Sequence, residues 1–136
     1  MSELSVNILS PAKVVSKTKA TQVQAPGALG SLGILPGHTA LVSELMLGEL
    51  IVDSTEASGR IVYFISGGYL DVAQDDVTVL VDVIEKATDI DTARAEKAKQ
   101  RAQERLEKRG DDIDMARAQA ALLRAQQRLA IVSRYR

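Results

Sequence analysis

Short runs in the first part of the chain alternate apolar and polar residues, as strands do when one of their faces is buried. The clearest alternation is that of Leu4, Val6 and Ile8. Alternation is also seen at 20–24 and 50–52, and further runs, rich in β-branched or aromatic residues, lie at 60–65, 69–72 and 77–83. Turn-forming pairs such as Pro26-Gly27 and Gly67-Gly68 separate them. This pattern predicts a small antiparallel β-sandwich or flattened barrel.

The hydrophobic period changes towards the end of the chain. From Ile90 to Arg109, and again from Ile113 to Val132, almost every residue is a strong helix former. Asp89 or Asp91 is placed to cap the first helix, and Gly110 follows its predicted end. Three acids put negative charge at the start of the second helix, namely Asp111, Asp112 and Asp114. Because the connection is so short, the sequence predicts an antiparallel α-helical hairpin.

Each predicted helix carries one narrow apolar stripe that consists mostly of alanine. The first stripe is Ala95, Ala98, Ala102 and Leu106, and the second is Ala118, Ala121, Ala125, Leu129 and Val132. A buried alanine methyl contributes less than about 1 kcal/mol, against roughly 1.5–3 kcal/mol for a leucine side chain. We therefore expect the hairpin to be held together only marginally. A static and tightly packed pair of helices is the alternative.

Charge divides the chain at the same place as the hydrophobic period. Residues 1–86 hold five bases and ten acids, a net charge of −5, whereas residues 87–136 hold twelve bases and eight acids, a net charge of +4. All three prolines lie in the first part. These shifts predict two domains, a β-sandwich over 1–86 and a helical hairpin over 87–136, and hence an α+β chain in two parts.

Several classes of chemistry are excluded by composition. The chain has no cysteine and one histidine, His38, so thiol chemistry is absent and a catalytic triad has a single candidate base. We expect no catalytic residues, no metal site and no required cofactor. No run of eighteen apolar residues is present and no basic-then-apolar signal opens the chain, so we expect neither a membrane span nor classical secretion.

Arginines recur on both predicted helices. Arg117, Arg124 and Arg128 form one line along the second helix, and Arg94, Arg101 and Arg105 form a similar line on the first. One interpretation is that their stems cover apolar surface while the guanidinium groups stay in water. The other is that guanidinium groups of both helices converge on an anion, since their planar fork suits phosphate. Either acids or a ligand must then neutralise them.

Other candidate motifs carry little chemistry. Gly27, Gly30 and Gly33 are spaced like a glycine-rich loop, but no Gly-Lys-Ser/Thr ending follows, and a structural turn is expected there. His38 follows a Pro-Gly turn and is expected to be structural or interfacial. The basic half has no aromatic platform except Tyr135, so no nucleic-acid binding is predicted.

Three stretches together resemble the epsilon subunit of bacterial F-type ATP synthase. They are Gly33-Ile34-Leu35-Pro36-Gly37-His38, then Ser66-Gly67-Gly68-Tyr69-Leu70-Asp71-Val72 with the strand that follows, and Asp89-Ile90-Asp91-Thr92-Ala93-Arg94-Ala95. The likeness covers essentially the whole chain. It implies an N-terminal β-sandwich and a C-terminal helical hairpin, in agreement with the patterns above.

The resemblance implies a non-catalytic subunit of the rotary central stalk. The sandwich would bind the gamma subunit and the c-ring, coupling proton-driven rotation to ATP synthesis. The hairpin would permit ATP hydrolysis when folded and inhibit it when extended along gamma into the alpha/beta catalytic head. The protein would lie at the cytoplasmic side of the bacterial plasma membrane, peripheral to it through the complex.

The resemblance also implies a regulatory ligand. In some bacterial members the folded hairpin binds ATP through an Ile/Leu-Asp-x-x-Arg-Ala motif, which is intact here around Ile90, Asp91 and Arg94. The family's other ATP-contacting positions correspond to Glu85, Arg101, Arg124 and Arg128. ATP is thus expected as a regulatory ligand, with Arg94, Arg124 and Arg128 on the phosphates, while Asp91 and Glu85 orient the nucleotide or pair with the arginines.

One position departs from the family pattern. The family commonly has Gly-Glu-Leu-Gly in the loop that meets the c-ring, whereas this chain has Gly30-Ser31-Leu32-Gly33. Ser31 and His38 are the expected contacts with the c-ring or gamma, without charge pairing at Ser31. The alternative function is a purely structural stalk scaffold whose hairpin neither opens nor binds ATP. A free-standing nucleotide hydrolase has neither a positioned base nor a metal site in its favour.

Overall fold

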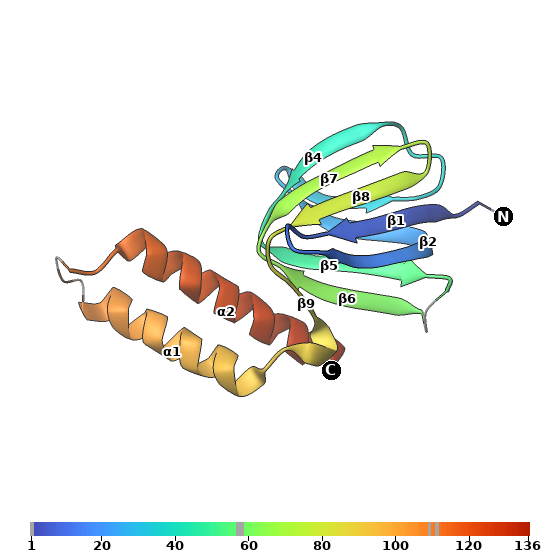
Figure 1. The fold of residues 1–136 in the computed structure, drawn as a ribbon. Helices are drawn as coiled ribbons and strands as arrows, with labels where there is room; N and C mark the ends of the chain where they lie inside the picture. Colours follow the sequence, from blue (N-terminus) through green and yellow to red (C-terminus); the bar gives the residue numbers. More distant parts are fainter. Residues whose placement is uncertain (1, 57–58, 109, 111) are drawn as a thin grey trace. The chain divides into compact units, whose positions relative to one another are not determined.

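The chain consists of two compact units, Met1–Lys86 and Ala87–Arg136. The computed structural model describes residues 2–56, 59–108, 110 and 112–136. The first unit is built of β-strands and the second of helices (Figure 1). This is the predicted α+β arrangement of a β-sandwich followed by a helical hairpin.

The described part of the first unit contains nine strands. In chain order they are β1 (Leu4–Leu9), β2 (Val14–Gly27), β3 (Gly30–Ile34), β4 (Leu41–Leu45), β5 (Gly48–Ser54), β6 (Arg60–Ile65), β7 (Gly68–Ala73), β8 (Asp76–Val81) and β9 (Ile84–Lys86).

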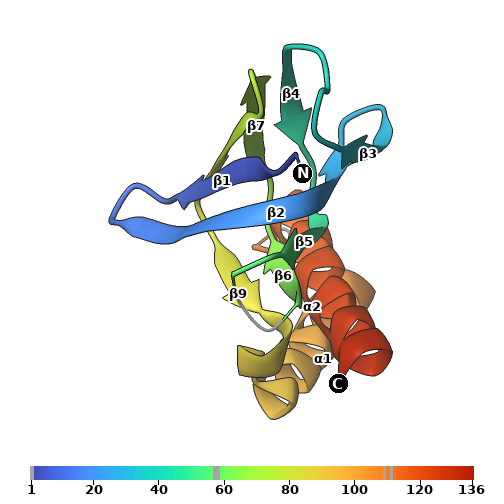
Figure 2. The same cartoon turned by 90° about the vertical axis from the view of Figure 1, so that its right-hand side faces the viewer.

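The strand order explains how the sandwich forms. It runs β1-β8-β7-β4-β2-β5-β6-β9, and β1 also pairs with β2 while β3 pairs with β2. The long strand β2 therefore belongs to both layers and crosses from one to the other (Figure 2). All pairings are antiparallel except that of β1 with β8, which is parallel. The prediction of an antiparallel sandwich thus holds with one exception, which arises because one edge of β1 is taken by its hairpin partner β2 and β8 runs alongside the other.

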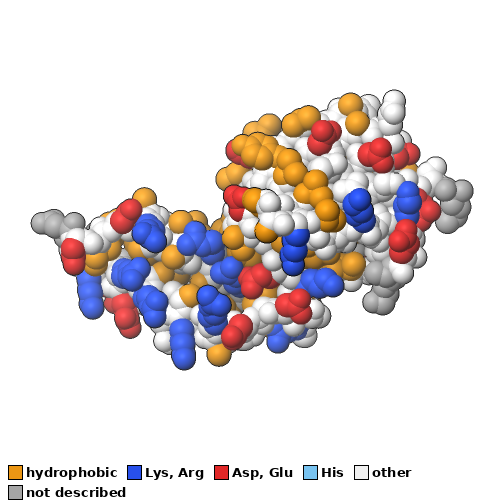
Figure 3. Space-filling view, in the orientation of Figure 1, with side chains coloured by type: hydrophobic (Ala, Val, Ile, Leu, Met, Phe, Trp, Pro, Cys, Tyr) orange, Lys and Arg blue, Asp and Glu red, His pale blue; other side chains and the backbone are white. Residues whose placement is uncertain are grey.

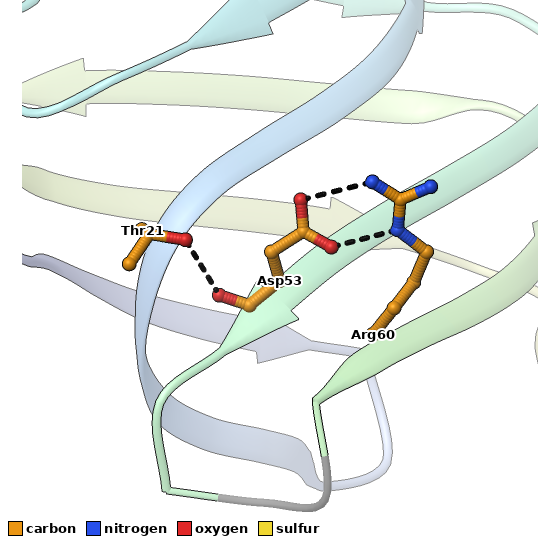
Figure 4. Close-up of polar contacts among 3 residues, drawn as sticks. All are labelled: Thr21, Asp53 and Arg60. Carbon is orange, nitrogen blue, oxygen red and sulfur yellow. Dashed lines mark hydrogen bonds and ion pairs between the residues drawn. The ribbon is translucent and has the colours of Figure 1, made fainter.

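The predicted alternation builds the core. Leu4, Val6 and Ile8 are 0–1% exposed, and they pack with apolar residues of β2, β5, β7 and β8. Outside this core, Arg60 of β6 donates to Asp53 of β5 through Nε at 2.8 Å and Nη2 at 3.2 Å, and the Asp53 carbonyl accepts from Thr21 of β2 at 3.4 Å (Figure 4). These contacts tie three neighbouring strands together at the surface.

The turn predicted at Pro26-Gly27 is displaced. Both residues lie in β2, which is 14 residues long, and the turn is formed by Ala28 and Leu29. Gly27 faces Gly30 across the hairpin, and a Cβ at Gly27 would lie 2.7 Å from the Gly30 carbonyl oxygen. Gly27 and Gly30 therefore serve a tight hairpin, as expected, whereas Gly33 lies within β3 opposite Gln24.

The second unit is a helical hairpin. A short 3₁₀ helix, η1 (Ala87–Asp89), leads into α1 (Thr92–Lys108), and α2 (Met115–Tyr135) runs back antiparallel to it (Figures 1 and 2). Both helices begin two residues later than predicted, because the preceding aspartate caps them, and α2 continues past Val132. Arg109 and Asp111, predicted at the facing ends of the two helices, lie outside the described residues. Gly110 follows α1, but its φ is not in the left-handed region that a glycine cap uses.

Candidate functional site

The seam of the hairpin is made of alanine. Ala95 and Ala102 of α1 and Ala118 and Ala125 of α2 are each 1–4% exposed. Small side chains every seventh residue let two helices approach closely, but they remove little apolar surface from water. The prediction of an alanine seam is confirmed, with two differences. Ala98 is exposed, and Ile131, which the periodicity put outside the seam, is fully buried.

The two helices repeat one sequence. Residues 90–108 and 113–131 are identical at 11 of 19 positions at an offset of 23. Both begin with the pattern Ile-Asp-x-Ala-Arg-Ala, and each of the four buried alanines directly follows an arginine. The sequence prediction missed this repeat, although comparing the two halves of the hairpin would have found it. The hairpin is therefore approximately two-fold symmetric.

The repeat places the predicted arginines on one face. An arginine that precedes a seam alanine lies about 100° around the helix from it, on the same flank in both copies. The two-fold axis of an antiparallel helix pair is perpendicular to the plane that contains both helices. The same flank of each helix therefore lies on the same side of that plane. We call this side the arginine face, and it carries Arg94, Arg101, Arg105, Arg117, Arg124 and Arg128. Lysine and arginine side chains cover both helices on the side seen in Figure 3.

Burial differs along the arginine face. Arg124 and Arg128 are half-buried, whereas the side chains of Arg94 and Arg101 are exposed. Near the connection between the helices, a polar groove of about 440 Å³ is lined by arginines of both helices together with two acids. The lining residues are Arg105, Asp112, Ile113, Asp114, Arg117 and Ala118. Arg105 of α1 and Arg117 of α2 thus line one shared groove, and neither belongs to the predicted ATP-contacting set.

The predicted ATP motif forms the start of α1. The Asp91 carboxylate accepts from the Arg94 backbone N–H at 3.1 Å, and the Asp91 carbonyl accepts from Ala95 N–H at 3.0 Å. Asp91 therefore caps the helix, as an aspartate does best, and Asp89 does not. Ile90 is 3% exposed and anchors the segment, whereas Asp91 and Arg94 are both exposed. Asp114 caps α2 in the same way, accepting from Arg117 N–H at 3.0 Å.

The last residue holds together the base of the hairpin, which is the end opposite the connection between the helices. The Arg136 guanidinium donates through Nη1 to the carbonyl of Ile90 at 2.6 Å and, at 3.4 Å, to that of Ala87. These two carbonyls belong to the segment by which the chain enters α1. We call this contact the Arg136 clamp. The sequence offered no signal for it, because the partners are backbone atoms 46 and 49 residues away.

Glu85 belongs to the first unit. It is half-buried in β9, where it pairs with Phe64 of β6. The other predicted ATP-contacting residues belong to the second unit.

Ser31 lies near the start of β3, and His38 lies beyond its end. Ser31 is exposed and sits within the strand, paired with Pro26, so the prediction of a loop at this position is wrong. The strand extends to Gly30 because the β2–β3 turn is only two residues long. His38 follows the turn after β3, is half-buried, and has Nδ1 within 2.6 Å of the Thr39 carbonyl oxygen.

An exposed apolar patch on the sandwich was not predicted. Val42 of β4, Tyr69 of β7 and Leu80 of β8 are 73%, 56% and 48% exposed. Tyr69 pairs with Leu80, and the β4–β7 register brings Val42 to the same face. We call these three residues the apolar patch. Beside it lies a largely apolar groove of about 410 Å³, and orange side chains follow this part of the sandwich in Figure 3. Strand pairing was needed to find the patch, because the three residues come from separate runs.

Two kinds of feature are absent from the described part of the chain. In residues 2–56, 59–108, 110 and 112–136, no group of three or more histidine, aspartate or glutamate side chains is arranged to hold a metal ion. Within the same ranges, neither helix combines the length and the hydropathy that crossing a bilayer demands.

Comparison with known sequences identifies the family. The profile of the ATP synthase delta/epsilon chain β-sandwich domain matches residues 3–87, and that of the long α-helix domain of the same chain matches residues 88–133. An ATP synthase epsilon chain of Polynucleobacter necessarius is 38% identical over 136 residues, covering 100% of this chain and 98% of that protein. One of Xanthomonas campestris is 45% identical over 112 residues, covering 82% and 79%.

Solved structures share the fold. A chain of the Euglena gracilis mitochondrial ATP synthase, in a structure of OSCP/F1/c-ring, matches with a TM-score of 0.85 at 19% identity, covering 96% of this chain and 81% of that one. A chain of the Tetrahymena thermophila central stalk/c-ring structure matches with a TM-score of 0.58 at 14% identity, covering 95% and 96%. The architecture is thus that of a two-domain ATP synthase delta/epsilon chain. The chain belongs to the ATP synthase delta/epsilon family, and within it to the epsilon chains of F-type ATP synthases.

The Arg136 clamp gives a first prediction. Replacing Arg136 with alanine removes a charged donor from two carbonyls, and hydrogen bonds to charged groups contribute about 1.5–3 kcal/mol, less where water has access. We expect the variant to lose about 1 kcal/mol of hairpin stability, with faster amide exchange in the last turn of α2. Hydrogen-exchange NMR of the full chain measures this. Lys97→Ala, which removes one exposed charge from α1, is the control, and equal exchange in both variants would contradict the role of the clamp.

Proposed function

We propose that this chain is a non-catalytic subunit of the ATP synthase rotor that couples rotation to ATP synthesis and regulates ATP hydrolysis. The proposal rests above all on the hairpin, whose weak alanine seam lies beside a face of six arginines. Such a pair of helices is easily opened and carries charge for an anionic partner in either state. Both solved structures that share the fold are of ATP synthase assemblies with a c-ring, which supports a place in the rotor.

In this proposal the sandwich makes the contacts that stay the same whether the hairpin is folded or extended. The apolar patch is the surface offered to the gamma subunit, since exposed apolar residues on adjacent strands are typical of protein–protein interfaces. Ser31 and His38 contact the c-ring or gamma from the two ends of β3. Because Ser31 carries no charge, the ring contact there consists of packing and hydrogen bonds. The protein would be held through these contacts at the cytoplasmic side of the bacterial plasma membrane.

The hairpin supplies the switch. Its helices of 17 and 21 residues are about 26 and 32 Å long, so an extended form reaches about 60 Å. Folded, it permits hydrolysis; extended along gamma, it brings the arginine face to acidic segments of the alpha/beta head and inhibits hydrolysis. Such a switch works when the free energies of the folded and extended states differ by no more than a few kcal/mol.

ATP would favour the folded state. Arg94, Arg124 and Arg128 bind the phosphates, since guanidinium groups form bidentate contacts with phosphate oxygens, and Arg101 is a further ATP contact. Asp91 and Glu85 orient the nucleotide or pair with the arginines. At about 100 times its dissociation constant, ATP contributes about 2.7 kcal/mol to the state that binds it. The protein needs no cofactor for this role, and ATP acts as a ligand.

A structural scaffold is the alternative function. The Arg136 clamp and the two aspartate caps favour it, because they hold the base and the helix starts of the folded hairpin in place. In that case the arginines pair with acids of the complex and the hairpin stays closed.

Removing the hairpin distinguishes the two functions. A chain ending at Lys86 keeps β9 and the whole sandwich core. We expect the complex to assemble normally and to hydrolyse ATP faster, because the inhibitory segment is gone. Assembly yield and steady-state hydrolysis of the purified complex measure both effects. Loss of assembly with unchanged hydrolysis per assembled complex would favour the scaffold.

The apolar patch is tested by a charge. Val42→Asp introduces a carboxylate at an exposed position, so the fold should persist while binding to gamma weakens at least about tenfold, or about 1.4 kcal/mol. Titration of purified gamma with the full chain measures the affinity. Leu29→Asp makes the same change at the fully exposed β2–β3 turn and should leave gamma binding unchanged. Equal affinities for the two variants would place the gamma contact elsewhere.

The repeat of the hairpin provides matched variants for ATP binding. Replacing Arg94 and Arg128 with alanine should lower ATP affinity at least about tenfold, or about 1.4 kcal/mol, as measured by calorimetric titration of the full chain. Their repeat equivalents, Arg117 and Arg105, line the groove at the other end. Alanine at both of these should leave ATP affinity unchanged. No heat from the unmodified chain at millimolar ATP would contradict ATP regulation.

A further inference from the structure

The turn between β7 and β8 has an unusual backbone. Ala73 pairs with Asp76, so the loop consists of Gln74 and Asp75 alone. Their φ angles are 52° and 64°, which puts two successive non-glycine residues in the left-handed region. A two-residue hairpin with positive φ at both positions strongly prefers Asn-Gly. Such strain persists where the surroundings impose it, and it often marks a functional position.

The Asp75 side chain contacts a distant turn. Its Oδ1 accepts a hydrogen bond from the Gly37 backbone N–H at 2.7 Å, across 38 residues of sequence. Its carbonyl accepts from Ser5 N–H of β1 at 2.8 Å. A glycine at position 75 would relieve the strained turn but would make only the second of these bonds. Asp75 therefore differs from glycine, the residue that the turn prefers, in having a carboxylate that binds the Gly37 N–H.

The turn that Asp75 holds carries exposed side chains. It is closed by the His38 N–H donating to the Leu35 carbonyl at 3.1 Å, and Gly37 within it has φ of 89°. Leu35 is 55% exposed, and His38 is half-buried. The segment between β3 and β4 has no ladder hydrogen bonds, so few bonds fix its conformation. The Asp75 carboxylate provides a tertiary bond in the middle of it.

We propose that Asp75 is a positioning residue that fixes the Leu35–His38 turn in the shape in which it docks on the rotor. The turn carries an exposed apolar side chain, Leu35, and the half-buried imidazole of His38, which suit a partner surface that offers apolar contacts and hydrogen bonds. Fixing the turn beforehand reduces the entropy lost on docking. The docking half of this proposal rests on the proposed function, whereas the contact between Asp75 and Gly37 does not.

Three variants of the full chain separate turn strain from positioning. Asp75→Gly removes the carboxylate and relieves the turn, so thermal stability should stay equal or rise, while the Gly37 amide exchanges about tenfold faster. Asp75→Asn keeps an acceptor oxygen and tolerates positive φ, so it should preserve Gly37 protection. Gln74→Gly relieves strain without touching the carboxylate and should also preserve it. Hydrogen-exchange NMR measures all three.

Binding to rotor assemblies provides the second measurement. The affinity of the full chain for a purified complex of gamma and c-ring should fall about tenfold for Asp75→Gly and return with Asp75→Asn. Unchanged Gly37 protection in Asp75→Gly would overturn the positioning role. Lost protection with unchanged affinity would overturn the docking role. If the unmodified chain failed to bind the complex at all, the proposed function would be wrong, while the exchange experiment would still decide the contact.

Discussion

Close packing of alanine against alanine is the constraint on which the hairpin depends. Because Ala95 and Ala102 are buried seven residues apart, and Ala118 and Ala125 of α2 are buried at the same spacing, the helices can lie close together without long side chains at these positions. The same choice keeps the apolar area small, so stability must come from the ends as well as from the seam. Aspartate caps and a terminal arginine supply it there. The hairpin therefore has a defined geometry, although little free energy is needed to separate its two helices.

Charge on the hairpin follows from the same repeat. An arginine next to each buried alanine is carried to one flank of its helix by the helical geometry, and the two-fold relation of the copies brings both flanks to one side. An Arg-Ala dipeptide that recurs after seven residues in each helix thus specifies both the packing of the seam and the charge beside it. The first unit contrasts with this, because its exposed apolar residues come from strands that the sequence separates widely and the sheet brings together.

Local periodicity predicted both helices and six of the strands but not β3, β4 or β9, which are short. Strand pairing was needed to find the surfaces. The alternation of β1 and the arginine lines were predicted because each repeats within one element. The length of β2 was underestimated because its first half is rich in lysine, serine and threonine, which resemble a loop. The apolar patch depends on register between three strands, and the contact of Asp75 with Gly37 depends on a side chain reaching a backbone N–H across the sheet. Single-chain patterns carry no signal for either. The capping role of Asp91 was predicted as one of two choices, and the structure decides between them.

The Arg136 clamp has a consequence for the path by which the helices separate. It fastens the end of α2 to the segment where the chain enters α1, so the base of the hairpin is closed by hydrogen bonds as well as by packing. Moving the end of α2 away from the start of α1 therefore requires both hydrogen bonds of the Arg136 clamp to break. A single guanidinium group thus controls the release of α2 at this end.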